Sequence, residues 1–200
     1  MTVSLRLPTL LLSAVLLLAA AIGGCGLLSI SAAEPDSLTA PHYSDIGSAP
    51  QPEVNQTAPD FSARNADGEA VHLRQVSEQQ PVLLLFYRGE WCPFCIDQLD
   101  SIKAVLPQLQ AYGVQLIAVS PDDVATSQNT RRQFGQGFMF WSDTSGEAMQ
   151  AYGIARDNGL PHPAVYLIGK GGELKWYYAS EDYKQRPTGE QLLEVIKATL

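Results

Sequence analysis

Two cysteines three residues apart, Cys92 and Cys95, are the side chains of this sequence best suited to chemistry. They follow an apolar run at 81–86 and precede an amphipathic stretch at 96–109, so the sequence predicts a strand that delivers both thiols to the start of a helix. A helix N-terminus carries partial positive charge and unpaired N–H groups, and it therefore stabilises a thiolate, the nucleophilic form of cysteine. This placement predicts redox chemistry rather than simple packing.

The neighbours of the dithiol suggest roles of their own. Cys92, nearer the solvent at the helix start, is the expected attacking thiolate, and Cys95, one turn deeper, is expected to resolve the mixed disulfide. Trp91 is expected to shield the pair and to offer a flat surface to a partner chain. Arg88 either lends positive charge to the site or is a solvated or ion-paired side chain. His162 is either a ligand or proton shuttle near the thiols or a loop residue.

The elements that must position these residues follow from apolar periodicity and turn signals. The buried strand, its helix and a second buried strand form a βαβ unit with parallel strands. Asp122 is the expected N-cap of the next helix, and Thr188 is the expected cap of the last one. The predicted elements are a hairpin at 61–64 and 70–73, strands at 82–87 and 114–119, helices at 96–109 and 123–134, a strand at 138–141, a helix at 145–152, a hairpin at 164–168 and 173–178, and a helix at 189–200.

A Cys-x-x-Cys motif at a strand-to-helix junction inside a βαβ unit is the thioredoxin-like signature. Further segments resemble the peroxiredoxin-like branch of the alkyl hydroperoxide reductase and thiol-specific antioxidant (AhpC/TSA) family over about residues 57–200. The resemblance implies an α/β, thioredoxin-like fold with a central mixed β-sheet, helices on both faces and an N-terminal β-hairpin extension. The segments are Ala58-Pro59-Asp60-Phe61, Phe86-Tyr87-Arg88-Gly89, Val119-Ser120-Pro121-Asp122 and Leu160-Pro161-His162-Pro163-Ala164.

Two departures separate this sequence from ordinary peroxiredoxins. Alignment on Cys95 puts Cys92 where those enzymes carry a Thr or Ser, and Pro163 stands where they carry an Arg before the strand at 164. The hydroxyl and the guanidinium that would polarise a peroxide O–O bond are therefore expected to be missing. Pro163 instead resembles the cis-proline that faces the dithiol of thioredoxins and receives the substrate backbone.

The leading hypothesis is accordingly a thiol-disulfide oxidoreductase that uses the Cys92 and Cys95 pair, with no cofactor and no metal, on protein or small-molecule disulfides and thiols. The alternative is a thiol peroxidase that reduces hydroperoxides through Cys95. A tethered metal- or thiol-binding protein is a third hypothesis. If it acts as a reductant, an exported dithiol also needs an electron supply, expected from an electron-donor thiol protein in the cell envelope.

The first 24 of the 200 residues are typical of a targeting segment, with Arg6 before an apolar stretch at 10–22. Ile22-Gly23-Gly24-Cys25 resembles a bacterial lipobox, which predicts lipidation at Cys25 and a membrane-anchored envelope protein facing the periplasm or the exterior. Residues 25–57 are expected to be a flexible tether and residues 58–200 one domain. The net charge of −8 disfavours nucleic acid as a partner.

Overall fold

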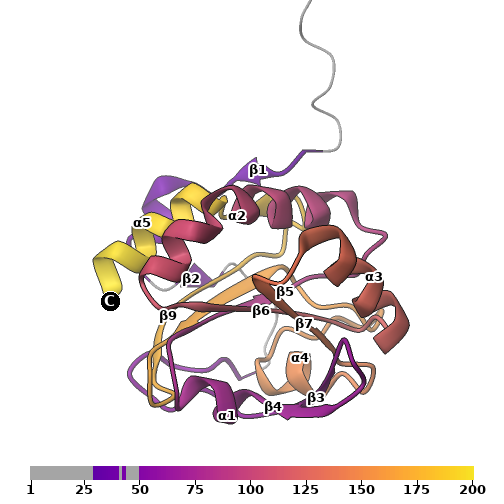
Figure 1. Cartoon of the computed structure of the whole chain (residues 1–200). Coiled ribbons are helices and arrows are strands. Elements are labelled where there is room, and N and C mark those ends of the chain that lie inside the picture. Colours follow the sequence, from indigo (N-terminus) through magenta and orange to yellow (C-terminus); the bar gives the residue numbers. More distant parts are fainter. Residues whose placement is uncertain (1–28, 41, 44–49) are drawn as a thin grey trace, which may run out of the picture.

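The central β-sheet has eight strands in the order β2-β9-β8-β5-β6-β7-β3-β4 (Figure 1). It is seen in a computed structural model that describes residues 29–40, 42–43 and 50–200. β5 (Val82–Phe86) lies in the middle, with all five residues buried. It pairs in parallel with β6 (Gln115–Ser120) and antiparallel with β8 (Ala164–Ile168). The predicted βαβ unit and central strand are confirmed.

The outer strands complete a mixed sheet. On one side of β6, β7 (Phe138–Ser142) runs parallel to it and is followed by the antiparallel hairpin of β3 (Ser62–Asn65) and β4 (Ala70–His72). On the other side, β8 forms the second predicted hairpin with β9 (Leu174–Ala179), and the two-residue β2 (His42–Tyr43) pairs with β9 at the edge. Both hairpins that the turn residues predict are therefore present.

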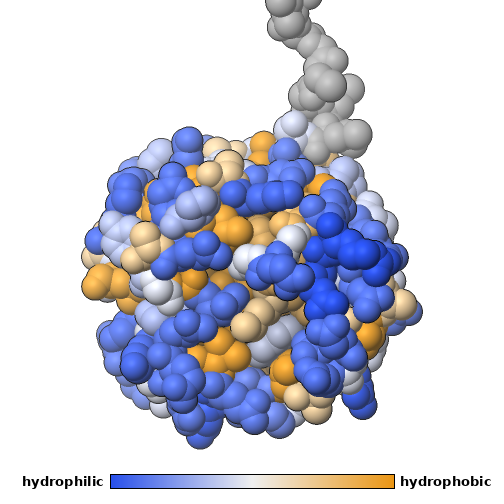
Figure 2. Space-filling model, viewed as in Figure 1, coloured by the Kyte–Doolittle hydropathy of each residue, from blue (hydrophilic) through white to orange (hydrophobic). Residues whose placement is uncertain are grey.

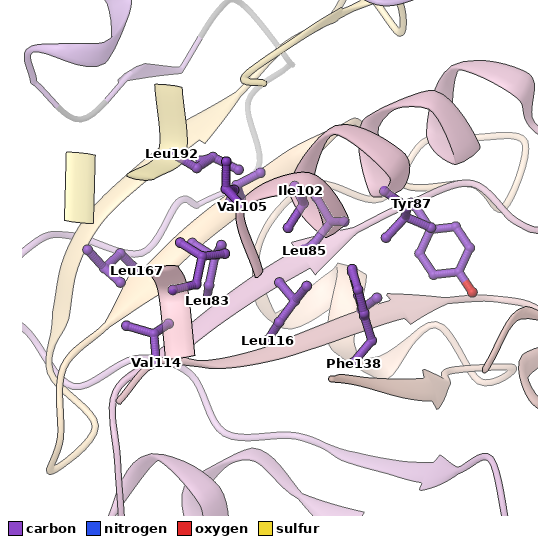
Figure 3. Packing of buried hydrophobic residues seen from close by; sticks show 14 of the residues in the cluster. Leu83, Leu85, Tyr87, Ile102, Val105, Val114, Leu116, Phe138, Leu167 and Leu192 are labelled. Atoms are coloured by element: carbon purple, nitrogen blue, oxygen red, sulfur yellow. The ribbon is translucent and has the colours of Figure 1, made fainter. Parts of the chain in front are cut away.

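Helices cover both faces of the sheet. The residues of β5 are all apolar and point alternately to opposite sides, so both faces of the sheet are apolar and both are buried under helices. Leu83 and Leu85 face one core, shown in Figure 3, which α2 (Pro93–Ala111) and α5 (Gly189–Thr199) complete. Leu84 and Phe86 face a second core, which α1 (Leu73–Ser77) and α4 (Glu147–Ala151) cover. α3 (Val124–Phe134) packs along β7 and adds Phe134 to the first core.

Two local expectations are wrong. Asp123, not Asp122, caps α3, since its side chain accepts a hydrogen bond from Thr126 N at 2.8 Å. Asp122 is instead held by the loop that carries the dithiol. The second error concerns Pro163, whose preceding peptide bond is trans, as are all the peptide bonds of the described residues. A cis bond was expected only from the likeness to thioredoxins, and an X-Pro bond is trans unless its surroundings favour the other isomer.

Part of the segment expected to be a flexible tether lies against the domain. β1 (Ser31–Ala32) pairs in parallel with β10 (Gln185–Arg186), and Ile30 N donates to Asp97 Oδ2 of α2 at 2.7 Å. A short 3₁₀ helix, η1 (Pro35–Leu38), follows, and Leu38 O accepts from Trp176 Nε1. The amino-acid composition did not indicate this contact. The segment is held by backbone pairing with a strand that is distant in sequence, and such pairing produces no periodic pattern of side chains. The targeting segment and Cys25 lie outside the described residues.

Polar residues cover most of the face shown in Figure 2, with apolar residues in small groups between them. Such a distribution is usual for a surface in contact with water. Within the described ranges, no helix has the length and apolar character needed to cross a membrane.

Candidate active site

The dithiol lies where α2 begins. Cys92 is the N-cap of the helix and Pro93 its first residue, a position at which the missing N–H of proline removes no hydrogen bond. Cys92 and Cys95 are joined in a disulfide, with their Cα atoms 5.2 Å apart. The sequence prediction of a paired Cys-x-x-Cys at a helix start is therefore reproduced by the structure. Both cysteines are buried, with exposed fractions of 1% and 0%, so Cys92 is hardly nearer to solvent than its partner in this oxidised state.

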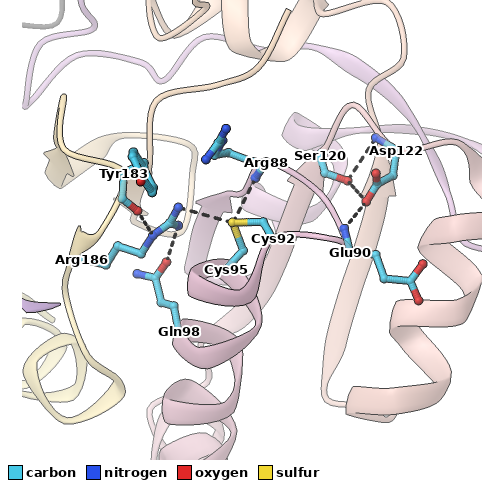
Figure 4. Close-up of a disulfide and its surroundings, with 9 residues drawn as sticks. All are labelled: Arg88, Glu90, Cys92, Cys95, Gln98, Ser120, Asp122, Tyr183 and Arg186. Carbon is cyan, nitrogen blue, oxygen red and sulfur yellow. Dashed lines mark hydrogen bonds between the residues drawn. A yellow bond between two sulfur atoms is a disulfide. The ribbon is translucent and has the colours of Figure 1, made fainter. Parts of the chain in front are cut away.

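Sγ of Cys95 faces two N–H donors. Arg88 donates from its backbone N at 3.4 Å, and Arg186 donates from Nη2 at 3.4 Å (Figure 4). Within the described residues, Sγ of Cys92 accepts no such hydrogen bond, and Cys92 is the N-cap at the end of the helix. Hydrogen bonds and positive charge at a sulfur favour its thiolate form. The site is therefore asymmetric, and Cys95 is the sulfur on which negative charge is better stabilised.

Arg186 is fully buried and held in place by three contacts. Its Nε donates to Tyr183 O at 2.9 Å and its Nη1 donates to Gln98 Oε1 at 3.0 Å, while Nη2 reaches Cys95. Gln98 is fixed in turn because its Nε2 donates to Pro187 O at 3.0 Å. Burial, followed by the charge of Arg88, lowers the pKa of Arg186 to about 9, which still leaves the guanidinium charged at neutral pH. The carbonyl and amide partners are neutral, so the charge remains free to act on the sulfur.

The side chain of Arg88 lies at the mouth of the site. Its guanidinium carbon is 4.9 Å from the centre of the Trp91 ring and 5.0 Å from that of the Tyr183 ring, distances at which a cation is attracted to an aromatic face. Burial, followed by the charge of Arg156, lowers the pKa of Arg88. Within the described residues no salt bridge involves Arg88, so the ion-paired side chain that the sequence left open is not observed there.

Asp122 anchors the loop that leads to Cys92. Its Oδ2 accepts a hydrogen bond from Glu90 N at 2.8 Å and another from Ser120 Oγ at 3.1 Å. Burial is the main cause that raises the pKa of Asp122. Gly89 has a φ of 143°, and a Cβ atom there would lie 2.7 Å from Asp122 Oδ1 and 2.7 Å from Trp91 Nε1. The loop therefore requires glycine at this position, since the indole ring folds back over it.

Trp91 and Pro163 lie on elements that meet near the dithiol. Trp91 is 60% exposed, so it offers the flat apolar surface predicted for a partner chain. Pro163 is buried directly before β8, and its carbonyl accepts from Ser180 N at 3.1 Å. In the register of the two strands, Ala164 pairs with Phe86, which places the start of β8 beside the strand end from which the cysteine loop leaves.

His162 is buried, with an exposed fraction of 7%, and its Nδ1 has no hydrogen-bond partner. Burial, followed by the charge of Arg156, lowers the pKa of the ring, which is therefore neutral at pH 7. Its backbone N donates to Ile154 O at 2.8 Å. In the described part of the chain no hydrogen bond joins this ring to either sulfur, so the structure does not bring His162 to the dithiol as a ligand.

The residue that sequence reasoning missed is Arg186. A guanidinium was expected to be missing because Pro163 occupies the place where it was sought, yet one reaches Cys95 from β10, 91 residues along the chain. The sequence carries little signal for it, since a single Arg between Gln185 and Pro187 is usually a surface residue. Within the described residues, no three His, Cys, Asp or Glu side chains are grouped as metal ligands would be.

Comparison with known sequences supports the resemblance. The profile of the AhpC/TSA family matches residues 54–177. Peroxiredoxin Q, chloroplastic, from Oryza sativa subsp. japonica is 26% identical over 137 residues, which cover 68% of this chain and 63% of that protein. The thiol-disulfide oxidoreductase ResA of Geobacillus thermodenitrificans is 28% identical over 61% of this chain and 67% of its own length. Alkyl hydroperoxide reductase E of Mycobacterium tuberculosis is 27% identical over 62% and 82%. The match thus spans less than two thirds of the rice protein.

Solved structures confirm the fold. A peroxiredoxin-like protein from Aquifex aeolicus superimposes with a TM-score of 0.67 at 17% identity, over 76% of this chain and 90% of the other. Peroxidoxin BcpB from Mycobacterium tuberculosis gives a TM-score of 0.64 at 18% identity, over 73% and 97%. At such identities the likeness shows the fold alone, and it is the α/β thioredoxin-like fold that the sequence predicts.

Proposed function

Because the chain belongs to the AhpC/TSA family, whose profile matches residues 54–177, we propose that it is a thiol-disulfide oxidoreductase acting through Cys92 and Cys95. The observation that carries this proposal is the disulfide at the start of α2, with only one of its two sulfurs facing a buried cation. A symmetric structural disulfide would need no such difference, whereas exchange chemistry needs one sulfur to leave and the other to be attacked.

The asymmetry assigns the two roles. A thiol that is stabilised as thiolate is the better leaving group, and Arg186 with the Arg88 backbone N–H stabilises Cys95 in this way. An incoming thiolate therefore attacks Sγ of Cys92 and forms a mixed disulfide, while the electron pair of the broken bond remains on Cys95. In the reverse direction the Cys95 thiolate attacks Cys92 Sγ and releases the reduced substrate. Because Cys92 is only 1% exposed, the residues that cover it must move aside before an incoming thiolate can reach its sulfur.

A second candidate function, a thiol peroxidase, is favoured by the contact between Arg186 and Cys95. A reduced Cys95 thiolate beside a buried cation is suited to attack the O–O bond of a hydroperoxide, which yields a sulfenic acid on Cys95 and an alcohol or water. The Cys92 thiol then displaces water from the sulfenic acid and closes the same disulfide. When the protein reduces disulfides or hydroperoxides, an electron-donor thiol protein must reduce Cys92–Cys95 for a further cycle, and we include such a partner in the proposal.

Two variants separate the candidates. For disulfide exchange, we expect Cys95→Ser to accumulate a mixed disulfide through Cys92 when it is mixed with oxidised insulin, and Cys92→Ser to be inactive in insulin reduction. For peroxide reduction, rapid second-order oxidation by hydrogen peroxide should be lost in Cys95→Ser and kept in Cys92→Ser. The leading proposal fails if the wild-type protein shows only the second pattern and no disulfide exchange.

We also propose that the protein is anchored to a cell-envelope membrane by lipid on Cys25. The support is in the sequence, where an apolar run ends in Ile22-Gly23-Gly24-Cys25. Metabolic labelling with a fatty acid in a bacterial host tests the proposal. Label should enter the wild-type chain and be absent from Cys25→Ser, while equal labelling of both would contradict it.

A further inference from the structure

Arg88 is a cation of this site that forms no salt bridge with any described residue. Among the same residues, its buried Nε has no hydrogen-bond partner. Its guanidinium is instead held between two aromatic rings, those of Trp91 and Tyr183. A guanidinium held by flat apolar surfaces keeps N–H groups free for a planar anion, which it can bind through two parallel hydrogen bonds.

Further positive charge gathers around the Tyr183 ring. Lys184 Nζ lies 5.6 Å from the centre of this ring and 5.8 Å from that of Phe94. Arg186 lies beneath, donating to Tyr183 O, and Arg156 is near enough for its charge to act on both Arg88 and His162. The acidic groups of this region are Glu181, which acts on His162, and Asp182, which acts on Arg186. Glu90 and Asp122 lie on the other side of the dithiol, in and below the cysteine loop.

Positive charge is therefore concentrated on the Tyr183 side of the site, where Arg88 and Lys184 both lie against the ring, although the whole chain has a net charge of −8. Local charge opposite in sign to the rest of a protein draws ligands of the other sign to that place. The main chain of Arg88 contacts the reacting atoms, since its backbone N lies 3.4 Å from Cys95 Sγ. Tyr183, whose ring holds the Arg88 guanidinium, accepts at its carbonyl a hydrogen bond from Arg186, which contacts the same sulfur. Figure 4 shows the Arg88 side chain near Tyr183 and the Arg88 main chain at the disulfide.

We propose that the preferred small-molecule substrates of this site are thiols and disulfides that carry a carboxylate near the sulfur, and that Arg88 binds the carboxylate between Trp91 and Tyr183. This inference rests on the proposed disulfide exchange and adds the substrate class to it. The geometry favours a small anion over an extended acidic peptide, because a single guanidinium is held between the rings.

The reaction of such a thiol balances without another reactant. The first substrate thiolate bonds to Cys92 Sγ, the Cys92–Cys95 bond breaks, and the electron pair stays on Cys95 beside Arg186. A second substrate thiolate attacks the substrate sulfur of this mixed disulfide and releases Cys92 as thiolate. Two thiols are oxidised to one disulfide, two electrons enter the protein, and the two thiol protons pass to solvent or to the cysteines.

The test uses three small thiols that differ in charge: 3-mercaptopropionate, 2-mercaptoethanol and cysteamine. Reduction of the oxidised full-length protein is followed by tryptophan fluorescence, and each rate is expressed per thiolate because the three thiols differ in pKa. We expect the anionic thiol to react about tenfold faster than the neutral one and the cationic thiol to be slowest, with the difference falling as salt is added.

Arg88→Gln should reduce the ratio of the anionic to the neutral rate to near one. The matched control is Lys170→Gln, which removes the same charge from the turn between β8 and β9. This turn follows Ile168, which pairs with Val82 at the end of β5 opposite to the dithiol. This control should keep the ratio. Equal rates per thiolate for the three thiols, or an unchanged ratio in Arg88→Gln, overturn the substrate assignment while leaving disulfide exchange intact. Failure of all three thiols to reduce the disulfide overturns the proposed function itself.

Discussion

The guanidinium of Arg186 donates a hydrogen bond to Sγ of Cys95 across 91 residues of sequence. It joins β10 to the first turn of α2, and it gives the two cysteines different chemical surroundings. Most of the behaviour expected of the dithiol depends on this contact.

Replacing Arg186 with Gln should make the disulfide harder to reduce. The guanidinium stabilises the thiolate of the reduced protein, so its loss lowers the reduction potential. A hydrogen bond to a charged group contributes about 1.5–3 kcal/mol, which corresponds to a fall of roughly 30–60 mV. Equilibration with glutathione measures the potential. Arg186→Lys, which keeps a charge, should shift it less, and an unchanged potential in the Gln variant of a folded protein would refute the role of Arg186.

Gly89→Ala should disturb the loop before Cys92. The residue has a φ of 143°, and the new methyl group would meet Asp122 and Trp91. We expect a loss of about 1–3 kcal/mol in the free energy of unfolding and slower exchange at Cys92. Gly159→Ala is the matched control, because Gly159 also has positive φ, at 73°, but has open space around it. Urea unfolding of both variants separates the steric effect from backbone strain, and equal losses would show that the contacts at Gly89 do not matter.

The buried His162 should make stability depend on pH. Its pKa in the folded protein is lowered by burial and by Arg156, whereas in the unfolded chain it titrates near 6.5. As the pH falls below this value, the unfolded state binds a proton that the folded state does not, so this contribution to stability is present above pH 6.5 and is lost on acidification. Urea unfolding at several pH values should show a smaller loss on the acid side in His162→Gln than in the wild type. Identical pH profiles would show that the buried ring does not contribute.

Asp97→Ala should loosen the N-terminal segment from α2, because Asp97 Oδ2 accepts the hydrogen bond of Ile30 N. A charge-assisted hydrogen bond of this kind is worth about 1.5–3 kcal/mol, so the amides of residues 30–33 should exchange with solvent at least about tenfold faster. Asp100→Ala, on an exposed position of the same helix, is the control and should leave these amides protected. Protection that persists in Asp97→Ala would mean that the β1–β10 pairing alone holds the segment.

The sequence made most strands and helices of the domain predictable, because they have local signatures. The five-residue α1 and the two-residue β1, β2 and β10 were not predicted. Unbroken apolar residues at 82–86 mark the central strand, and Thr188 with Gln191 forms the capping box of α5. The placement of the dithiol followed from the junction of two such signatures. In contrast, the environment of Cys95 depends on where the chain returns after β9. A strand of two residues such as β10 is too short to show a periodic pattern, and its position is determined by the strand with which it pairs. The sequence therefore does not indicate that Arg186 is buried.

The N-cap of α3 is another feature that could not be predicted from the local sequence. Asp122 and Asp123 are equally good capping residues, and sequence alone gave no reason to choose the second. The choice is made by the cysteine loop, which occupies Asp122 through the N–H of Glu90. A tertiary contact therefore shifts the helix start by one residue and turns the first aspartate into a support of the active site.

The pairing of β1 with β10 limits how far the domain can stand from a membrane. If Cys25 carries lipid, as proposed, five peptide units separate it from Ile30, which is fixed to α2. Fully extended, they reach about 18 Å at most. The same β10 carries Arg186, so the reactive disulfide would be held within a narrow zone above the bilayer. Within that zone, membrane-bound thiol partners would meet the disulfide at a high effective concentration, and bulky soluble proteins would have to approach it from the side.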